Sequence, residues 1–268
     1  MLPKAMQPES DTRIQHARST SGDELNSLLH ESNEETLLAI LENANLQEQH
    51  VTALLERLDL PVTVLSAVAG EGKWTSCEGI RLRLASHPRT PKRFAVAAVR
   101  QLFLFDLVRL SLLPSAPPDI RRLAEEVILA RVPNIPAGEK LTLARRGPAR
   151  VAGAILAESH PQAIKLALAN PFLTESQVLK VLAKADVHER VVQAIAEHTK
   201  WSCRYNVRAA LARNARAPVP TVLAFLSDLT QRDLRDICAM DGVVPAVRKH
   251  IEEELARRAE VAAKKTGK

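Results

Sequence analysis

The sequence predicts an all-α fold, and more specifically an α-solenoid of roughly 16 or 17 short helices. Its composition is the first observation behind this prediction, since the 268 residues include 16 Pro, only nine Gly and only 3% aromatic side chains. Chains rich in Ala, Leu, Arg and Glu favour helices, whereas sheets favour aromatic and β-branched residues. Regularly placed prolines and an internal sequence match are the other two observations.

Apolar residues recur at helical spacing in blocks of roughly ten to fourteen residues. Val51, Leu54, Leu55 and Leu58 form one such stripe, and Val178, Val181 and Leu182 form another. Helix-start signals precede many blocks, because a capping residue or a proline suits the first turn, where backbone N–H groups have no intrahelical partner. These signals are Asn33, Thr174, Asp106, Asp233, Pro61, Pro91, Pro118, Pro136, Pro218 and Pro245.

The chain also matches itself at a constant offset. Residues 24–128 align without a gap onto residues 151–255, and 28 of the 105 pairs are identical. The strongest stretch pairs KWTSCEGIRLRLASHPRTP (73–91) with KWSCRYNVRAALARNARAP (200–218). We call two residues equivalent when this offset pairs them. An ungapped match of this length predicts a 127-residue internal duplication, in which short amphipathic helices stack side by side to bury a continuous core.

The match and the local composition together predict the organisation of the chain. A polar stretch poor in aliphatic residues, 1–22, is expected to be a disordered arm, and the basic end, 259–268, a disordered tail. Between them we expect a single solenoid over 23–258. It comprises copy one at 24–128, a linker helix within 129–150 and copy two at 151–255.

Helix, turn and helix with Ala and Leu at packed positions recur in Leu166-Ala-Leu-Ala-Asn-Pro171 and Leu211-Ala-Arg-Asn214. This signature resembles the HEAT and armadillo-type repeat superfamily, including its leucine-rich-repeat-variant relatives. The resemblance is one of architecture over about 23–258. It implies a curved scaffold that binds another macromolecule, usually a protein, and it transfers no site residues.

Positive side chains retained in both halves are the candidate binding residues. On one face they would suit phosphates or acidic segments; alternatively they form salt bridges to retained acids such as Asp106 and Asp233. The pairs are Lys73/Lys200, Arg81/Arg208, Arg89/Arg216 and Arg121/Arg248. Trp74 and Trp201 are also retained. We expect them to be structural, each filling a groove between helices, with exposed interaction anchors as the alternative.

Several function classes find no support in the residues. Cys77, Cys203 and Cys238 form no metal-binding or disulfide pattern, and the eight His show no ligand spacing, so no metal or cofactor is expected. GEGKWTS (70–76) departs from the phosphate-loop spacing. Without a catalytic motif, an export signal or a membrane span, we expect a cytoplasmic protein that is not an enzyme and has no small-molecule substrate.

The leading functional hypothesis is therefore a non-enzymatic scaffold or adaptor that binds another protein on a concave face. The alternative is duplex nucleic-acid binding through the basic C-terminal half. Residues 1–134 hold 15 Lys and Arg against 17 Asp and Glu, while the remainder hold 22 against 14. Few aromatic residues are available for stacking on bases, which leaves phosphate contacts as the route to nucleic acid.

Overall fold

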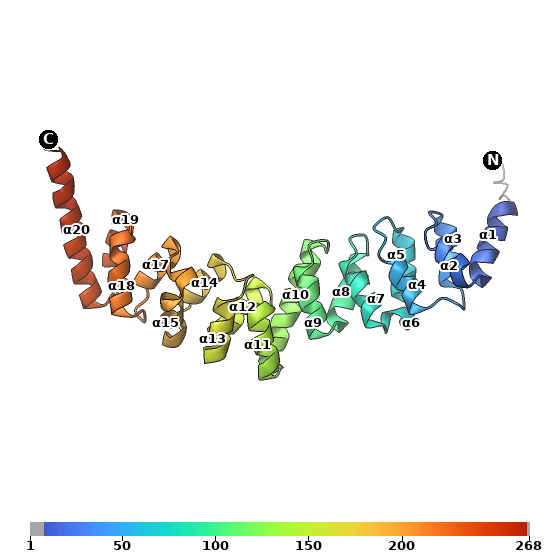
Figure 1. Ribbon diagram of the computed structural model, residues 1–268, viewed down its shortest axis with the longest axis horizontal. Coiled ribbons are helices and arrows are strands. Elements are labelled where there is room, and N and C mark those ends of the chain that lie inside the picture. Colours follow the sequence, from blue (N-terminus) through green and yellow to red (C-terminus); the bar gives the residue numbers. More distant parts are fainter. Residues whose placement is uncertain (1–7, 267–268) are drawn as a thin grey trace. The chain divides into compact units, whose positions relative to one another are not determined.

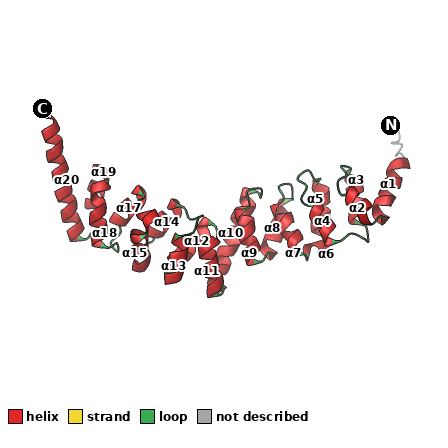
Figure 2. Cartoon of the chain, viewed as in Figure 1, coloured by secondary structure: helices red, strands yellow, loops and turns green. Residues whose placement is uncertain are grey.

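A computed structural model describes residues 8–266, whose only regular elements are helices (Figure 2). They comprise 20 α-helices and two short 3₁₀ helices, so the predicted all-α class is confirmed. The count exceeds the expected 16 or 17 because single-turn helices, such as Gly72–Thr75 and Thr199–Ser202, are too short to show apolar periodicity. No helix within residues 8–266 combines the length and apolar character needed to cross a bilayer.

The chain divides into two compact units, Met1–Ala130 and Arg131–Lys268. In the first unit, each helix packs on neighbours that are close to it in sequence, as in the contacts of α1 with α3, α3 with α5 and α7 with α8 and α9 (Figure 1). Its helices are α1 (Pro8–Ser19), α2 (Gly22–Leu28), α3 (Glu34–Leu41), α4 (Glu48–Leu54), α5 (Val62–Gly70), α6 (Gly72–Thr75), α7 (Glu78–Ser86), α8 (Lys92–Gln101), α9 (Leu104–Leu112) and α10 (Pro118–Arg131), which ends just past the boundary.

The second unit is built in the same sequential way, with α11 packed on α12 and α13, α14 on α17, and α19 on α20. Its elements are the 3₁₀ helix Val132–Asn134, then α11 (Ala137–Arg146), α12 (Ala149–Ala157), α13 (Pro161–Leu168), α14 (Glu175–Leu182), α15 (Glu189–Glu197), α16 (Thr199–Ser202), α17 (Tyr205–Ala212), α18 (Val219–Phe225), the 3₁₀ helix Leu226–Asp228, α19 (Gln231–Cys238) and α20 (Pro245–Thr266).

Helix starts in the two units follow the offset of the sequence match. The nine helices α2 to α10 correspond in order to α12 to α20. Each of the nine begins 127 residues before its counterpart. The pair before them departs by two residues, since α1 begins at Pro8 and α11 at Ala137. The same local signals therefore start the same helices in both units.

The predicted start signals stand where the helices begin. Pro61, Pro91, Pro136 and Pro218 each immediately precede a helix, while Pro118 and Pro245 are first helical residues. Asn33 caps α3, because its side-chain oxygen accepts hydrogen bonds from the backbone N–H groups of the first turn. Aliphatic residues fill each interior, including the fully buried Leu37, Leu54 and Leu65 of the first unit and Ile155, Val192 and Leu211 of the second.

Helices extend into both end regions for which the composition predicts disorder. Helix α1 lies within the expected disordered arm, where Ala17 is fully buried and Ile14 packs on the core of the first unit. A few apolar residues suffice there because α3 provides the surface that covers them. Helix α20 continues to Thr266 through residues of high helix propensity. The remaining parts of these two expectations, 1–7 and 267–268, lie outside the described residues.

The expected linker, 129–150, includes one complete helix. It contains α11, whose Leu143 and Ala144 are buried and which packs on α12 and α13. Helix α11 is therefore an integral first helix of the second unit, in the position that α1 occupies in the first.

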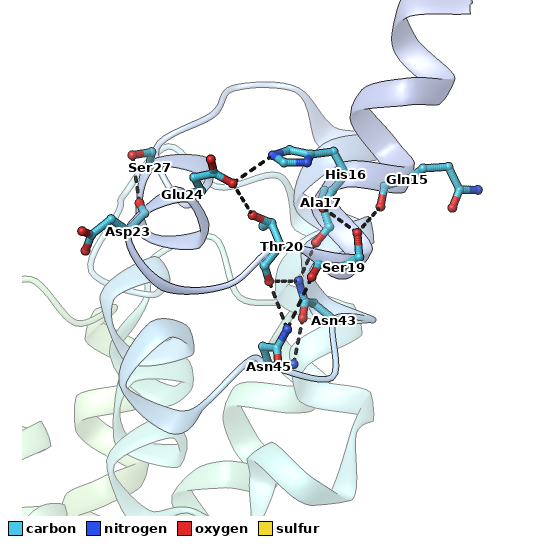
Figure 3. Close-up of polar contacts among 10 residues, drawn as sticks. All are labelled: Gln15, His16, Ala17, Ser19, Thr20, Asp23, Glu24, Ser27, Asn43 and Asn45. Carbon is cyan, nitrogen blue, oxygen red and sulfur yellow. Dashed lines mark hydrogen bonds and ion pairs between the residues drawn. The ribbon is translucent and has the colours of Figure 1, made fainter.

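Two asparagines in turns hold the ends of earlier helices. The buried side-chain amide of Asn43, which follows α3, donates to the carbonyls of Ala17 and Thr20 at 2.8 and 2.9 Å (Figure 3). The equivalent Asn170 donates to the carbonyls of Ala144 and Gly147 at 2.8 and 3.0 Å. The last carbonyls of a helix lack intrahelical donors. Each asparagine therefore satisfies two carbonyls at or just after the end of a helix that lies well before it in the chain.

His87 and Asn214 form a second such pair. The His87 Nδ1 atom accepts a hydrogen bond from the N–H of Arg89, so its protonated Nε2 donates to the Arg57 carbonyl at 2.8 Å. The Asn214 side chain accepts from the N–H of Arg216 and donates to the Leu182 carbonyl at 3.2 Å. An imidazole and an amide thus perform the same task at equivalent positions. Burial is the main cause that lowers the pKa of His87 below its usual value.

Replacing either turn asparagine should destabilise its unit. Asn170→Ala removes the side-chain donor of the Ala144 and Gly147 carbonyls, while Asn43→Ala removes the donor of the Ala17 carbonyl and leaves the Thr20 carbonyl only the longer bond from Asn45. We expect the free energy of unfolding to fall by about 2 kcal/mol in each case. Urea denaturation followed by circular dichroism measures the change. Asn45→Ala is the matched control, because its amide makes longer bonds of 3.3 and 3.5 Å near the surface. Equal losses for Asn43 and Asn45 would contradict the assignment.

His87 should make the first unit sensitive to acid. Because the folded-state pKa of His87 lies below the unfolded value of about 6.5, the unfolded chain binds the extra proton more readily. The free energy of unfolding should therefore fall as the pH drops below that value. His87→Asn should reduce this fall, and Asn214→His should add one in the second unit. Urea titrations at about pH 7.5 and about pH 5.5 compare the variants; an unchanged pH dependence in both would refute the prediction.

Candidate functional site

Both tryptophans are interior residues rather than exposed anchors. Trp74 and Trp201 are 4% and 2% exposed, and the indole N–H of Trp201 donates to the Leu168 carbonyl at 2.9 Å. The predicted binding residues Lys73 and Lys200 lie over these rings, with Nζ atoms 4.3 and 4.4 Å from the ring centroids. Each lysine thus covers its neighbouring tryptophan through a cation–π contact.

Arg89 and Arg216 bind backbone carbonyls of earlier turns. Arg89 donates to the Asp59 carbonyl at 2.7 Å, and Arg216 donates to the carbonyls of Ala185 and Val187. Arg57 and Arg258 make contacts of the same kind, to Leu29 and Leu229 respectively. Sequence reasoning did not single out these last two, although all four arginines stand 28 to 31 residues after the carbonyls named here.

Arg81 and Arg208 are engaged in ion pairs. Arg81 pairs with Glu78 and lies near the Gln101 side chain, 3.5 Å away. Arg208 pairs with Asp228, which is equivalent to Gln101, and also donates to the Ser202 carbonyl. Its guanidinium lies 5.1 Å from the Phe225 ring centroid. Neither arginine pairs with the retained acids that the sequence suggested as partners.

The two members of the last predicted pair, Arg121 and Arg248, have different surroundings. Arg248 donates to the Met240 carbonyl at 3.0 Å on the surface of the second unit. The Nε atom of Arg121 is buried and has no hydrogen-bond partner among the described residues. Lys73 also donates to the Leu46 carbonyl, at 3.4 Å. Side-chain hydrogen bonds or ion pairs within their own unit are thus made by six of the eight predicted residues, namely Lys73, Arg81, Arg89, Arg208, Arg216 and Arg248.

A polar cluster around the retained Asp106 and Asp233 was not recognised as such in the sequence. In the second unit the Tyr205 hydroxyl donates to Asp233 and accepts from the Thr230 N–H at 3.1 Å. In the first unit Glu78, at the place of Tyr205, accepts from the Phe103 N–H at 2.9 Å. The substitution alters the chemistry of the cluster but keeps the bond to the residue that immediately precedes α9 or α19.

The two clusters differ electrostatically. Hydrogen bonds from Tyr205, Thr230 and Arg213, in that order, lower the pKa of Asp233 to about 2. In the first unit, burial and then the adjacent carboxylate of Glu78 raise the pKa of Asp106 above its usual value. A phenol donor favours the ionised acid, whereas a second carboxylate disfavours it. The internal alignment contained the signal, because it pairs Glu78 with Tyr205 and also pairs the two aspartates.

Exposed aromatic side chains lie outside the retained set. Phe103, immediately before α9, is 67% exposed, and Phe105 in its first turn is 51% exposed. The equivalent residues of the second unit are the polar Thr230 and Arg232. This aromatic pair is specific to the first unit. Within residues 8–266 no group of three or more His, Cys, Asp or Glu is arranged to hold a metal ion.

No protein-family model, curated protein or solved structure matches this chain.

Arg208 should contribute measurably to the stability of the second unit. Arg208→Met keeps an apolar stem beside Phe225 but removes the bonds to Asp228 and the Ser202 carbonyl. We expect the free energy of unfolding to fall by about 1 kcal/mol. Arg235→Met, at an exposed site on α19, is the control and should change stability by less than about 0.5 kcal/mol. Urea denaturation measures the free energy of unfolding of both variants. Equal losses for Arg208→Met and Arg235→Met would show that the Arg208 contacts do not stabilise the unit.

Proposed function

We propose that the chain is an α-solenoid of the HEAT and armadillo type, made from two copies of a ten-helix unit, and that it acts as a non-enzymatic scaffold that binds another protein. The observation that carries the proposal is the constant spacing between the starts of nine helix pairs. Unrelated helical units would not maintain one spacing through the eight loops that connect these nine helices. A duplicated solenoid does so because each turn must deliver the next helix to the same place.

The links between helices support the same proposal. Asn43 and Asn170 reach carbonyls of residues that are themselves equivalent, namely Ala17 and Ala144. Where a linking side chain differs, as for His87 and Asn214, the backbone partner lies in a comparable turn. The two units thus share the links between neighbouring helices, which is typical of repeats that depend on their neighbours for burial.

The use of the retained charges favours a scaffold over an enzyme. Arg81, Arg89 and their counterparts bond to carboxylates and carbonyls of their own units. Their retention is therefore accounted for by the fold. Direct binding by the eight predicted residues remains a prediction, for which Lys73 and Lys200, exposed on the outer side of their tryptophans, are accessible members.

We assign the protein-binding surface to residues that the two units do not share. Phe103 and Phe105 expose large apolar rings at the start of α9, and aromatic residues are enriched in protein interfaces and among their hot spots. Because the second unit has Thr230 and Arg232 at these positions, a partner would recognise the first unit specifically.

The proposed surface can be tested by affinity purification from native cells. Phe103→Ser combined with Phe105→Ser should abolish recovery of a partner without changing the helical circular dichroism. The control is Leu58→Ser combined with Val62→Ser, which removes two other exposed apolar side chains of the same unit, 64% and 47% exposed. If the variant with both Phe103→Ser and Phe105→Ser recovers the same partner as the unchanged chain, this surface is excluded.

Duplex nucleic-acid binding is the second candidate, favoured by the excess of eight positive charges in residues 135–268. A protein that neutralises DNA phosphates releases bound counterions, so its affinity for DNA falls steeply as the salt concentration rises. A titration of generic duplex DNA at low and physiological salt therefore separates the candidates. Tight, strongly salt-dependent binding would favour nucleic acid, and no binding at low salt would remove this alternative.

A further inference from the structure

A pocket of about 320 Å³ lies in the second unit, among α11, α12 and α13. Leu141, Ile155 and Ala163 form its apolar wall, while Lys140, Glu158 and His160 contribute polar groups. This volume is at the small end of the range for ligand sites, about 300–1,000 Å³. An apolar wall with a few polar groups is the usual composition of such sites. An occupant would therefore be a small molecule with an aliphatic part.

The charged groups of the pocket are one cation and one anion. The Lys140 Nζ atom lies 3.2 Å from a carboxylate oxygen of Glu158, and the two side chains are 25% and 38% exposed. A ligand that carried a single charge would leave one member of this pair without a partner. A ligand with both a carboxylate and an ammonium group can bind both members, so that no charge loses its partner.

The backbone at the pocket is in an unusual conformation. Ser159, between Glu158 and His160, has φ of 63° and is the one non-glycine residue with positive φ in the described part of the chain. The left-handed region is unfavourable for residues other than Gly, Asn and Asp. The same Glu-Ser pair occurs at Glu31 and Ser32 in the first unit, where Ser32 has no positive φ.

Strained conformations of this kind persist where the surrounding structure requires them, and they cluster at ligand sites. In this unit the conformation places two polar residues beside an apolar wall. The strain at Ser159 and the composition of the pocket are separate observations, and both point to a ligand site at the same place.

From this arrangement we infer that the second unit binds a free aliphatic α-amino acid. The carboxylate of the ligand would pair with Lys140 and its ammonium group with Glu158, while its side chain would contact Leu141, Ile155 and Ala163. The ligand replaces the Lys140–Glu158 contact with two new ion pairs. This inference does not depend on the proposed protein-binding function, because it concerns a different unit and a different kind of ligand.

Isothermal titration calorimetry of the full chain with L-leucine tests the inference. Leucine should bind, and three compounds that each lack one feature should bind at least about tenfold more weakly. They are 4-methylpentanoic acid without the amine, 3-methylbutylamine without the carboxylate, and glycine without the aliphatic side chain. Equal binding of leucine and 4-methylpentanoic acid would overturn the assignment of Glu158, and no binding of millimolar leucine would overturn the whole inference.

Variants of the charged pair provide the second arm. Lys140→Met and Glu158→Gln should each weaken leucine binding by at least about tenfold. The matched controls are Arg13→Met and Glu31→Gln, which change the equivalent residues of the first unit and should leave binding unchanged. Both pocket side chains are partly exposed, so circular dichroism should show an intact fold. Unchanged leucine affinity in the two pocket variants would refute the inference.

Discussion

The structure depends on one constraint, namely that the last carbonyls of a short helix must find hydrogen-bond donors outside that helix. With helices of about two turns, these carbonyls are a large share of all backbone acceptors. Here side chains from later turns donate to them. Asn43 and Asn170 do so from buried positions, and Arg89 and Arg216 donate from the surface to carbonyls of the turns that follow α4 and α14. Each bond joins segments that are far apart in the sequence.

This constraint explains which polar residues the two units share. A side chain that must reach a given carbonyl can change only to another donor of similar reach. His87 and Asn214 satisfy this condition, because an imidazole N–H and an amide N–H both point to an earlier turn. Glu78 and Tyr205 satisfy the corresponding condition for an acceptor, since both place an oxygen at the N–H of the residue immediately before α9 or α19. Hydrogen bonds, that of Tyr205 first, lower the pKa of Asp233, whereas burial and then the Glu78 carboxylate raise the pKa of Asp106.

Recognition is better sought among the residues that the units do not share. Phe103 and Phe105 form an exposed aromatic pair that the second unit lacks at the equivalent positions, and the pocket beside Ser159 in the second unit combines an apolar wall with a cation and an anion. In the functions proposed here, the shared turn residues maintain the architecture, and two other features, the aromatic pair of the first unit and the pocket of the second, select a ligand or partner.

The sequence by itself determined the helical class, the helix starts at residues such as Asn33 and Pro218, and the constant offset between the two units, because capping and apolar periodicity are local effects. It also named the paired arginines as important. Only the tertiary structure decided what they contact, that α1 is ordered, that α11 belongs to the second unit, and that Ser159 is left-handed beside a pocket. These features depend on hydrogen bonds and packing between segments far apart in the chain, and neither composition nor spacing specifies which distant groups will meet.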